Sequence, residues 1–249
     1  MRFILLLSVL MLAFSSFAND SSSSKIIKIS AGDWPPFIGK DLDDFGTLGK
    51  KITEVFALEG YSVEFNFYPW TRAYVKAQQG EFDATAIWMF EESRTEHFDY
   101  SDPVGKEEFV FFYNTDASFD WSSLDEIKGK EIGGEIGYSY GEELDSLIES
   151  GQVNMSRVKE TRQNLLRLKH KRIELYAQER HIGMYKLSLQ PEDVQASISY
   201  HPKPFLTNDS FLLFSKQSPN KQELLEAFNR GLKKWQQQNP NGNGNGNGN

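Results

Sequence analysis

Apolar and polar residues follow two different periods along the chain. Residues 25–31 predict a strand, and residues 61–67 alternate apolar with polar side chains as a half-buried strand does. Between them, apolar residues over 48–56 recur at helical spacing, and Gly60 marks the end of that helix. The chain therefore opens with a strand, a helix and a second strand.

The same alternation continues to the end of the chain. Further strands are predicted at residues 82–88, 108–113, 130–137, 172–178 and 210–216, and helices before Gly80, near 140–150, after 178 and from about 220. Strands that alternate with helices indicate an α/β fold with a mostly parallel sheet. The strands form two groups, one on each side of residue 108, and this grouping predicts two lobes.

Both ends of the chain differ from this pattern. The first 18 residues carry a positive residue, an apolar run too short for a membrane anchor and a small-x-small site ending at Ala18, which predicts a cleavable signal peptide. Residues 19–24 predict a flexible leader, and the Asn/Gly tail over 239–249 predicts disorder. We expect the mature protein to be exported.

Composition excludes several classes of protein. The chain has no cysteine, which removes disulfides, thiolate metal sites and a lipid anchor at an N-terminal cysteine. A formal charge of −8 without a basic stripe disfavours nucleic-acid binding. Aromatic residues make up 14% of the chain, and tryptophan and tyrosine often line small-molecule pockets.

Two tryptophans follow predicted strands. Ligands of open α/β sheets bind at the carboxyl ends of strands, where Trp34 and Trp70 stand. Two prolines stiffen the loop after Trp34, so its indole could stack on a ligand or pack under the loop as core. Arg72, two residues after Trp70, could join this site or lie on the surface.

The segment "GYSYG" over 137–141 allows two interpretations. It matches the G-x-S-x-G nucleophile elbow, with Asp193 and His201 following in the order of a hydrolase triad. Alternatively, Tyr138 and Ser139 stand at a helix N-terminus and receive an anion. The four histidines show no metal-binding spacing, and no phosphate-binding glycine motif is present.

Arg94 is the one arginine in an acidic stretch, "EESRTEHFDYSD". Such a stretch is commonly a solvated surface loop with weak ion pairs. A guanidinium in a cleft, however, can hold a carboxylate through two parallel hydrogen bonds.

An ordered set of segments resembles extracellular solute-binding proteins of family 3, the receptors of polar amino-acid importers. The segments are "AGDWPPF", "GEFDA", "SRTEHFDYSDP", "LDEIKGKEIGGEIGYSYG", "RIELYAQE" and "FLLFSK". The resemblance implies a type II clamshell of two lobes with mixed, mostly parallel sheets flanked by helices. It places residues 25–107 and 201–238 in one lobe and 108–200 in the other.

The resemblance also assigns ligand-binding residues. Arg94, seven residues before Ser101, would hold a ligand carboxylate, and Glu179 would hold an amino group. The aromatic and hydroxyl positions of the family match Trp34, Trp70, Tyr138 and Ser139, and the bulky Trp88 and Met89 stand where the family has small hydroxyl residues. Glu179 replaces the commoner aspartate and is followed by Arg180, which could neutralise it.

We therefore expect a monomeric periplasmic protein without cofactor or catalysis, which captures an amino acid or similar carboxylate for a membrane ABC permease. Two alternatives remain. One is an enzyme on the same scaffold, resembling cyclohexadienyl dehydratases, with Glu179 as general acid. The other is a sensor subunit without an importer.

Overall fold

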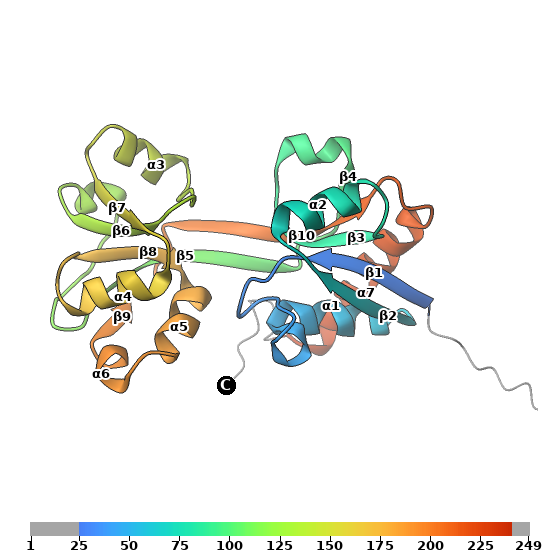
Figure 1. Cartoon of the computed structure of the whole chain (residues 1–249), viewed down its shortest axis with the longest axis horizontal. Coiled ribbons are helices and arrows are strands. Elements are labelled where there is room, and N and C mark those ends of the chain that lie inside the picture. Colours follow the sequence, from blue (N-terminus) through green and yellow to red (C-terminus); the bar gives the residue numbers. More distant parts are fainter. Residues whose placement is uncertain (1–24, 241–249) are drawn as a thin grey trace, which may run out of the picture.

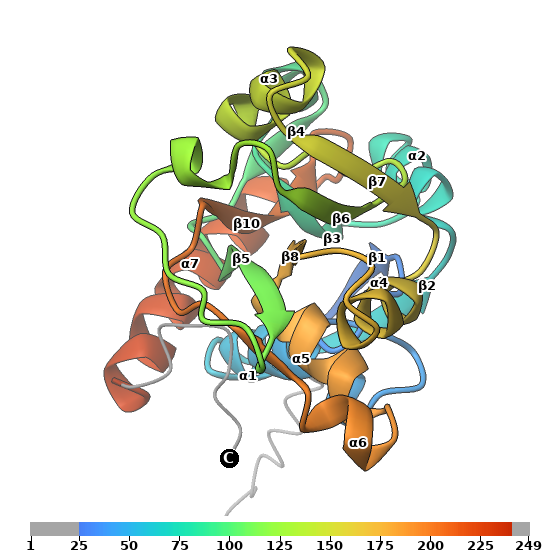
Figure 2. The ribbon, with the colours of Figure 1, turned by 90° about the vertical axis from the view of Figure 1, so that its left-hand side faces the viewer.

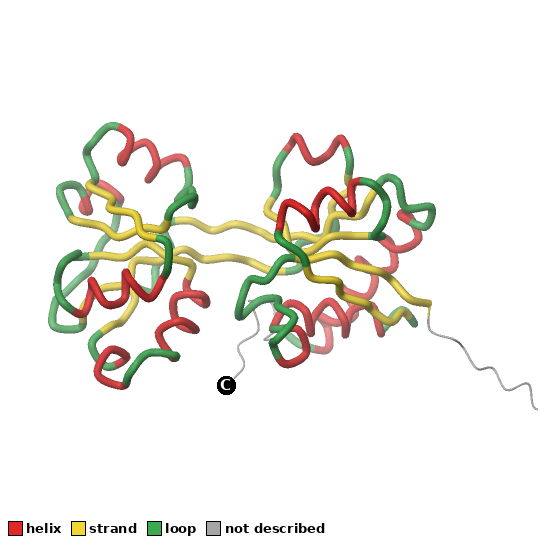
Figure 3. Tube along the Cα trace, viewed as in Figure 1, coloured by secondary structure: helices red, strands yellow, loops and turns green. Residues whose placement is uncertain are grey.

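The computed structural model describes residues 25–240. The predicted signal peptide, the leader and the tail from residue 241 lie outside the described residues. Two groups of helices and strands are joined by two long strands, β5 and β10 (Figures 1 and 3). Within residues 25–240 no helix combines the length and the apolar character that a membrane span needs.

The first lobe contains the beginning and the end of the described chain. Its elements are β1 (Lys25–Ala31), β2 (Tyr61–Phe67), β3 (Ala84–Met89), β4 (Phe98–Tyr100), α1 (Thr47–Ala57), α2 (Trp70–Gln78), α7 (Lys221–Gln238) and the 3-10 helices η1 (Asp43–Phe45) and η2 (Glu92–Glu96). α1 and α7 cover one face of the strands and α2 covers the other (Figure 1).

The second lobe lies between the two linking strands in sequence. Its elements are β6 (Glu131–Glu135), β7 (Asn154–Val158), β8 (Leu175–Glu179), β9 (Ile198–Tyr200), α3 (Glu142–Glu149), α4 (Thr161–Lys169), α5 (Arg180–Ser188), α6 (Glu192–Gln195) and the 3-10 helix η3 (Leu124–Ile127). Figure 2 shows α3 on one side of its strands and α4 and α5 on the other. The linking strands are β5 (Gly105–Asn114) and β10 (Leu206–Ser215).

The strands form one mixed sheet in the order β2-β1-β3-β10-β5-β8-β6-β7, with β4 on β10 and β9 on β5. Pairing is parallel among β1, β2 and β3 and among β6, β7 and β8. The linking strands pair antiparallel with each other and with their neighbours. The sheet thus has a parallel centre in each lobe, and the carboxyl ends of both centres point toward the space between the lobes.

Side-chain alternation along β5 builds two layers of core in the second lobe. Phe109 and Phe111 pack in the cluster that includes α3, whereas Val110 and Phe112 pack in the cluster with α4. This is the period of two that a strand with both faces covered requires. At the lobe junction, Ile182 of α5 packs in the core of the first lobe.

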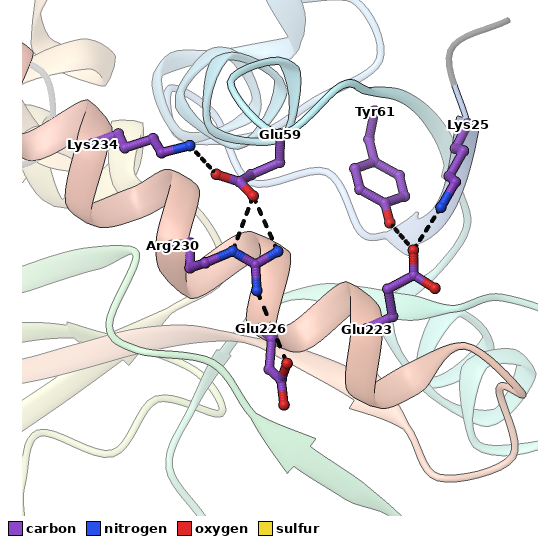
Figure 4. Close-up of polar contacts among 7 residues, drawn as sticks. All are labelled: Lys25, Glu59, Tyr61, Glu223, Glu226, Arg230 and Lys234. Carbon is purple, nitrogen blue, oxygen red and sulfur yellow. Dashed lines mark hydrogen bonds and ion pairs between the residues drawn. The ribbon is translucent and has the colours of Figure 1, made fainter. Parts of the chain in front are cut away.

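Polar contacts fix α7 against the start of the first lobe (Figure 4). Glu59 accepts hydrogen bonds from Arg230 Nε at 3.1 Å and Lys234 Nζ at 2.6 Å. Glu223 accepts from Lys25 and from the Tyr61 hydroxyl, both at 2.7 Å. The last helix is therefore held to the first lobe at both of its ends.

Several elements differ from the sequence prediction. β7 and α4 were not predicted, because β7 is a polar edge strand without strong alternation. β10 begins at Leu206, earlier than residue 210, since its polar first half crosses between the lobes instead of packing in a core. The predicted lobe boundaries at 107/108 and 200/201 fall in β5 and after β9, and they stay a prediction.

Candidate functional site

A cleft of about 770 Å³ lies between the lobes. Both lobes and both linking strands contribute to its surface. Its lining residues are Trp34, Trp70, Ile87, Trp88, Met89, Glu91, Arg94, Phe109, Gly137, Tyr138, Ser139, Gly141, Leu206 and Asn208. Seven of the nine residues predicted to bind a ligand are among them: Trp34, Trp70, Trp88, Met89, Arg94, Tyr138 and Ser139.

A tight turn presents Trp34 to the cleft. The Trp34 N–H donates to Ile38 O at 2.7 Å, and Phe37 N–H donates back to Trp34 O at 2.9 Å. Phe37 is buried, and its ring centroid lies 4.9 Å from that of Trp34. Because the turn is anchored in the core, the half-buried indole keeps one orientation at the cleft.

Trp70 stands at the first residue of α2, directly after Pro69. Its indole packs so closely on Gly32 that a Cβ at that position would lie 2.3 Å from the ring. Trp88 meets it edge-on, with ring centroids 5.2 Å apart. A glycine after β1 is therefore what lets the two indoles form one aromatic wall of the cleft.

Arg94 is held in the same wall by three contacts. Nη1 donates to Met89 O at 2.7 Å, and Nη2 lies 2.8 Å from Glu91 Oε2. The guanidinium carbon lies 4.9 Å from the centre of the Trp88 ring, a cation–π arrangement. Its side chain is 21% exposed, so Arg94 is a cleft residue and not part of a freely solvated surface run.

The second lobe contributes the loop between β6 and α3. Arg157 Nη1 donates to Glu135 O at 2.9 Å and to Tyr138 O at 2.7 Å, which fixes the loop. Ser139 Oγ donates to Asp145 at 2.6 Å, and Tyr140 N–H donates to the same carboxylate at 3.1 Å. Asp145 of this lobe thus already accepts the Ser139 hydroxyl, one of the two groups that the sequence analysis offered to an external anion, while Tyr138 is not bound to Asp145.

The Tyr138 hydroxyl is held neutral at the cleft. Burial raises the pKa of Tyr138 to about 12, the charge of Glu135 adds to the rise, and the nearby Trp34 indole opposes it. Trp34 and Tyr138 belong to different lobes, so this interaction crosses the cleft. Tyr138 acts there as a neutral hydrogen-bonding group.

Two predicted site residues do not line the cleft. Arg72 is exposed on α2, with its guanidinium 5.3 Å from the Tyr68 ring centre. Glu179 is fully buried: one oxygen accepts from Ile182 N–H at 2.8 Å and the other lies 3.0 Å from His181 Nδ1. Arg180 pairs with Glu108 at 2.7 Å instead of neutralising Glu179. The ligand-binding roles of Arg72 and Glu179 stay predictions.

Sequence reasoning missed the contribution of the linking strands. Phe109, Leu206 and Asn208 line the cleft floor, and Asn208 Nδ2 lies 3.2 Å from Met89 Sδ. The pairing of β5 with β10 brings them together, and no sequence pattern reveals that pairing. Glu91 was also missed as a lining residue, although its place three residues before Arg94 is a spacing that favours an ion pair.

A buried acid with one oxygen that makes no hydrogen bond within residues 25–240 lies in β5. Glu107 is buried, and its Oε2 makes no hydrogen bond within the described residues. Burial raises the pKa of Glu107 to about 8, and the charge of Glu179 adds to this. Phe109 follows Glu107 at i+2, so both side chains point to the cleft side of β5. Glu107 is thus a neutral acid at neutral pH.

Other chemistry suggested by the sequence finds no geometry. In the hydrolase interpretation Ser139, Asp193 and His201 would meet, but they contact Asp145, Lys169 and Asp120 respectively. Across residues 25–240 no three His, Cys, Asp or Glu side chains are grouped to hold a metal ion.

The family model of bacterial extracellular solute-binding proteins, family 3, matches residues 30–240. The chain belongs to this family. No curated protein matches its sequence significantly. Among solved structures, substrate-binding domain 2 of Lactococcus lactis GlnP in an open conformation is similar with a TM-score of 0.70 and 17% identity, over 88% of this chain and 92% of that one.

Two further similar structures show how the fold recurs. The L-cystine solute receptor of Neisseria gonorrhoeae, unliganded and open, has a TM-score of 0.69 and 18% identity, over 88% of this chain and 90% of that chain. A histidine kinase sensor domain similar to periplasmic binding proteins has a TM-score of 0.61 and 16% identity, over 87% of this chain and 93% of that chain. The two-lobe architecture expected from the sequence is confirmed.

Proposed function

We propose that this chain is an exported, monomeric solute-binding protein that captures a small carboxylate solute, an amino acid first, and presents it to a membrane ABC permease. Arg94 carries the proposal. It lies in the wall of an interlobe cleft, donates one hydrogen bond through Nη1 to Met89 O and forms an ion pair through Nη2 with Glu91. Since a guanidinium has five N–H donors, donors remain for a carboxylate.

Lobe closure would strengthen this contact. The lobes are joined by two strands, a connection that permits a hinge motion around a ligand. Closing over Arg94 would exclude water and raise the strength of its charge-assisted hydrogen bonds. Export through the signal peptide at residues 1–18 would place the protein in the periplasm.

A sensor role is a second candidate, because a histidine kinase sensor domain shares the architecture. An enzyme on this scaffold is less well supported. Its general acid would be Glu179, whose two oxygens are engaged by the start of α5 and by His181 away from the cleft lining.

The test is a screen of amino acids and other small organic acids against the purified protein. A bound solute should change tryptophan fluorescence and raise the melting temperature. At a solute concentration of 100 times its Kd, the free energy of unfolding should increase by about 2.7 kcal/mol. A complete screen without a shift would reject carboxylate binding. Each solute that binds should be recovered unchanged by chromatography after incubation with the protein. A new product that forms with the wild type but not with Glu179→Gln would favour the enzyme.

A further inference from the structure

A carboxylate and a guanidinium form an ion pair in the cleft wall. Glu91 Oε2 lies 2.8 Å from Arg94 Nη2, and both residues line the cleft. Among the described residues that line it, Glu91 is the one carboxylate. The Glu91 side chain is 55% exposed, so a solute in the open cleft can reach it.

Both partners keep capacity for a ligand. Arg94 donates one hydrogen bond to Met89 O and forms an ion pair with Glu91, so at most two of the five N–H groups of its guanidinium are engaged. Glu91 Oε1 accepts from Ser93 Oγ at 2.6 Å and Oε2 faces Arg94, whereas a carboxylate offers about four lone-pair sites. The pair therefore presents free donors beside free acceptors.

The main chain of Glu91 and the guanidinium of Arg94 are also held in place. The Tyr100 hydroxyl donates to Glu91 O and accepts from Glu91 N–H, both at 3.1 Å. Arg94 rests on the Trp88 ring. A site whose charges are held before binding loses less free energy to ordering when the ligand arrives.

Most of the cleft surface around this pair is apolar or aromatic. Trp34 and Trp70 face the cleft from the first lobe, and Phe109 and Leu206 form part of its floor. The acids of the second lobe near the cleft are already engaged, Glu179 by the start of α5 and Asp145 by Ser139. A ligand thus meets opposite charges at one point and a mostly apolar and aromatic surface elsewhere, where Tyr138, Ser139 and Asn208 are the neutral polar residues.

We propose that Glu91 receives the ammonium group of the ligand, so that Arg94 and Glu91 together recognise a zwitterion whose side chain is apolar or aromatic. This inference rests on the proposed function. An α-amino acid carries its carboxylate and ammonium on one carbon, and the two protein charges are correspondingly adjacent. Glu91 would then set the preference for amino acids over simple acids.

The experiment compares probes that differ only in the ammonium group. Calorimetry measures the binding of phenylalanine and 3-phenylpropionate, and of leucine and 4-methylpentanoate, to the full mature protein. In the wild type, at least one amino acid should bind about tenfold or more tightly than its deaminated partner. In Glu91→Gln that amino acid should weaken about tenfold or more, while the simple acid should keep or gain affinity because Arg94 is released.

Two variants sharpen the result. Glu91→Asp keeps the charge on a shorter side chain and should retain part of the preference. Glu92→Gln makes the same charge change on an exposed neighbour outside the cleft lining and should leave all affinities unchanged. Melting curves of each variant check the fold.

Three outcomes would overturn the inference. If Glu91→Gln raised the affinity for the amino acid and for its deaminated partner equally, Glu91 would only compete with the ligand carboxylate for Arg94. If neither affinity changed, Glu91 would have only a structural role. Failure of all four probes to bind the wild type would reject an apolar zwitterion as ligand. That failure leaves the proposed function to the wider carboxylate screen, which includes charged and polar acids.

Discussion

The two lobes face the cleft with different chemistry. The first lobe offers Arg94, Glu91 and three indoles, and its charged groups keep hydrogen-bonding capacity. The second lobe offers the glycine-rich loop around Tyr138 and Ser139.

The buried acid Glu135 of the second lobe is satisfied internally. Glu135 Oε1 accepts from Thr161 Oγ1 and the Tyr176 hydroxyl at 2.6 Å and from Gln178 Nε2 at 2.8 Å. A saturated polar network is rigid and has little left to offer a ligand. We infer that the first lobe recognises the solute and that the second mainly closes over it.

The largest effect should come from Arg94→Ala. Without the guanidinium, the carboxylate of the bound solute would be buried without a partner. This should reduce the binding free energy by about 2–5 kcal/mol, which is roughly 30-fold to several thousandfold in affinity. Arg94→Lys keeps the charge without the planar fork and should recover only part. Calorimetric titration with one identified ligand measures both. Arg162→Ala, exposed on α4 and outside the cleft lining, is the control, and equal losses of affinity at the two arginines would contradict the role of Arg94.

Glu107→Gln tests the strands that join the lobes. The pKa of Glu107 rises from 4.5 to about 8 on folding, so the folded state holds a proton that the unfolded chain loses between these values. Stability should therefore decline as pH rises through this window, by up to a few kcal/mol at 1.36 kcal/mol per pKa unit. Glu107→Gln should remove that decline in melting curves from pH 5 to 9.

The control for this prediction is Glu108→Gln on the opposite face of the same strand. Glu108 is paired with Arg180 at 2.7 Å, so its removal should not stabilise the protein at high pH. A wild-type melting temperature that is flat from pH 5 to 9 would contradict a buried, neutral Glu107.

Gly32→Ala targets the aromatic wall of the first lobe without touching a charge. The added Cβ would lie 2.3 Å from the Trp70 ring and must displace it. We expect a stability loss of about 1–3 kcal/mol, as for other overpacked sites, and weaker ligand binding. Melting curves and titration measure the two effects. Thr71→Ala, exposed beside Trp70, should change neither, and intact affinity in Gly32→Ala would show that the indoles do not contact the solute.

The smallest effect on binding should come from Ser139→Ala in the second lobe. Its hydroxyl donates to Asp145, so the loss of that hydrogen bond, about 0.5–1.5 kcal/mol, should appear mainly in stability. Affinity should fall less than about tenfold, or 1.4 kcal/mol. A large loss of affinity at an unchanged melting temperature would show that the second lobe also recognises the solute directly.

The sequence alone determined the class of the fold and seven of the residues that line the cleft. Strand and helix periods are local properties of the chain, so β1, α1, β2 and α7 matched their predicted ranges closely. Trp34 and Trp70 were expected at strand ends because the carboxyl ends of parallel strands face a common edge. The spacing of Arg94 from Ser101 carried the resemblance that placed it in the cleft.

Only the tertiary structure decided which polar groups are free to meet a solute. Glu179 and Glu91 are both glutamates near strand ends, yet one is fully buried at the start of α5 and the other lines the cleft. Pairing between β5 and β10 brings Phe109, Leu206 and Asn208 to the floor from positions about 100 residues apart. Burial and hydrogen-bond saturation depend on such distant partners, and a local pattern of residues does not encode them.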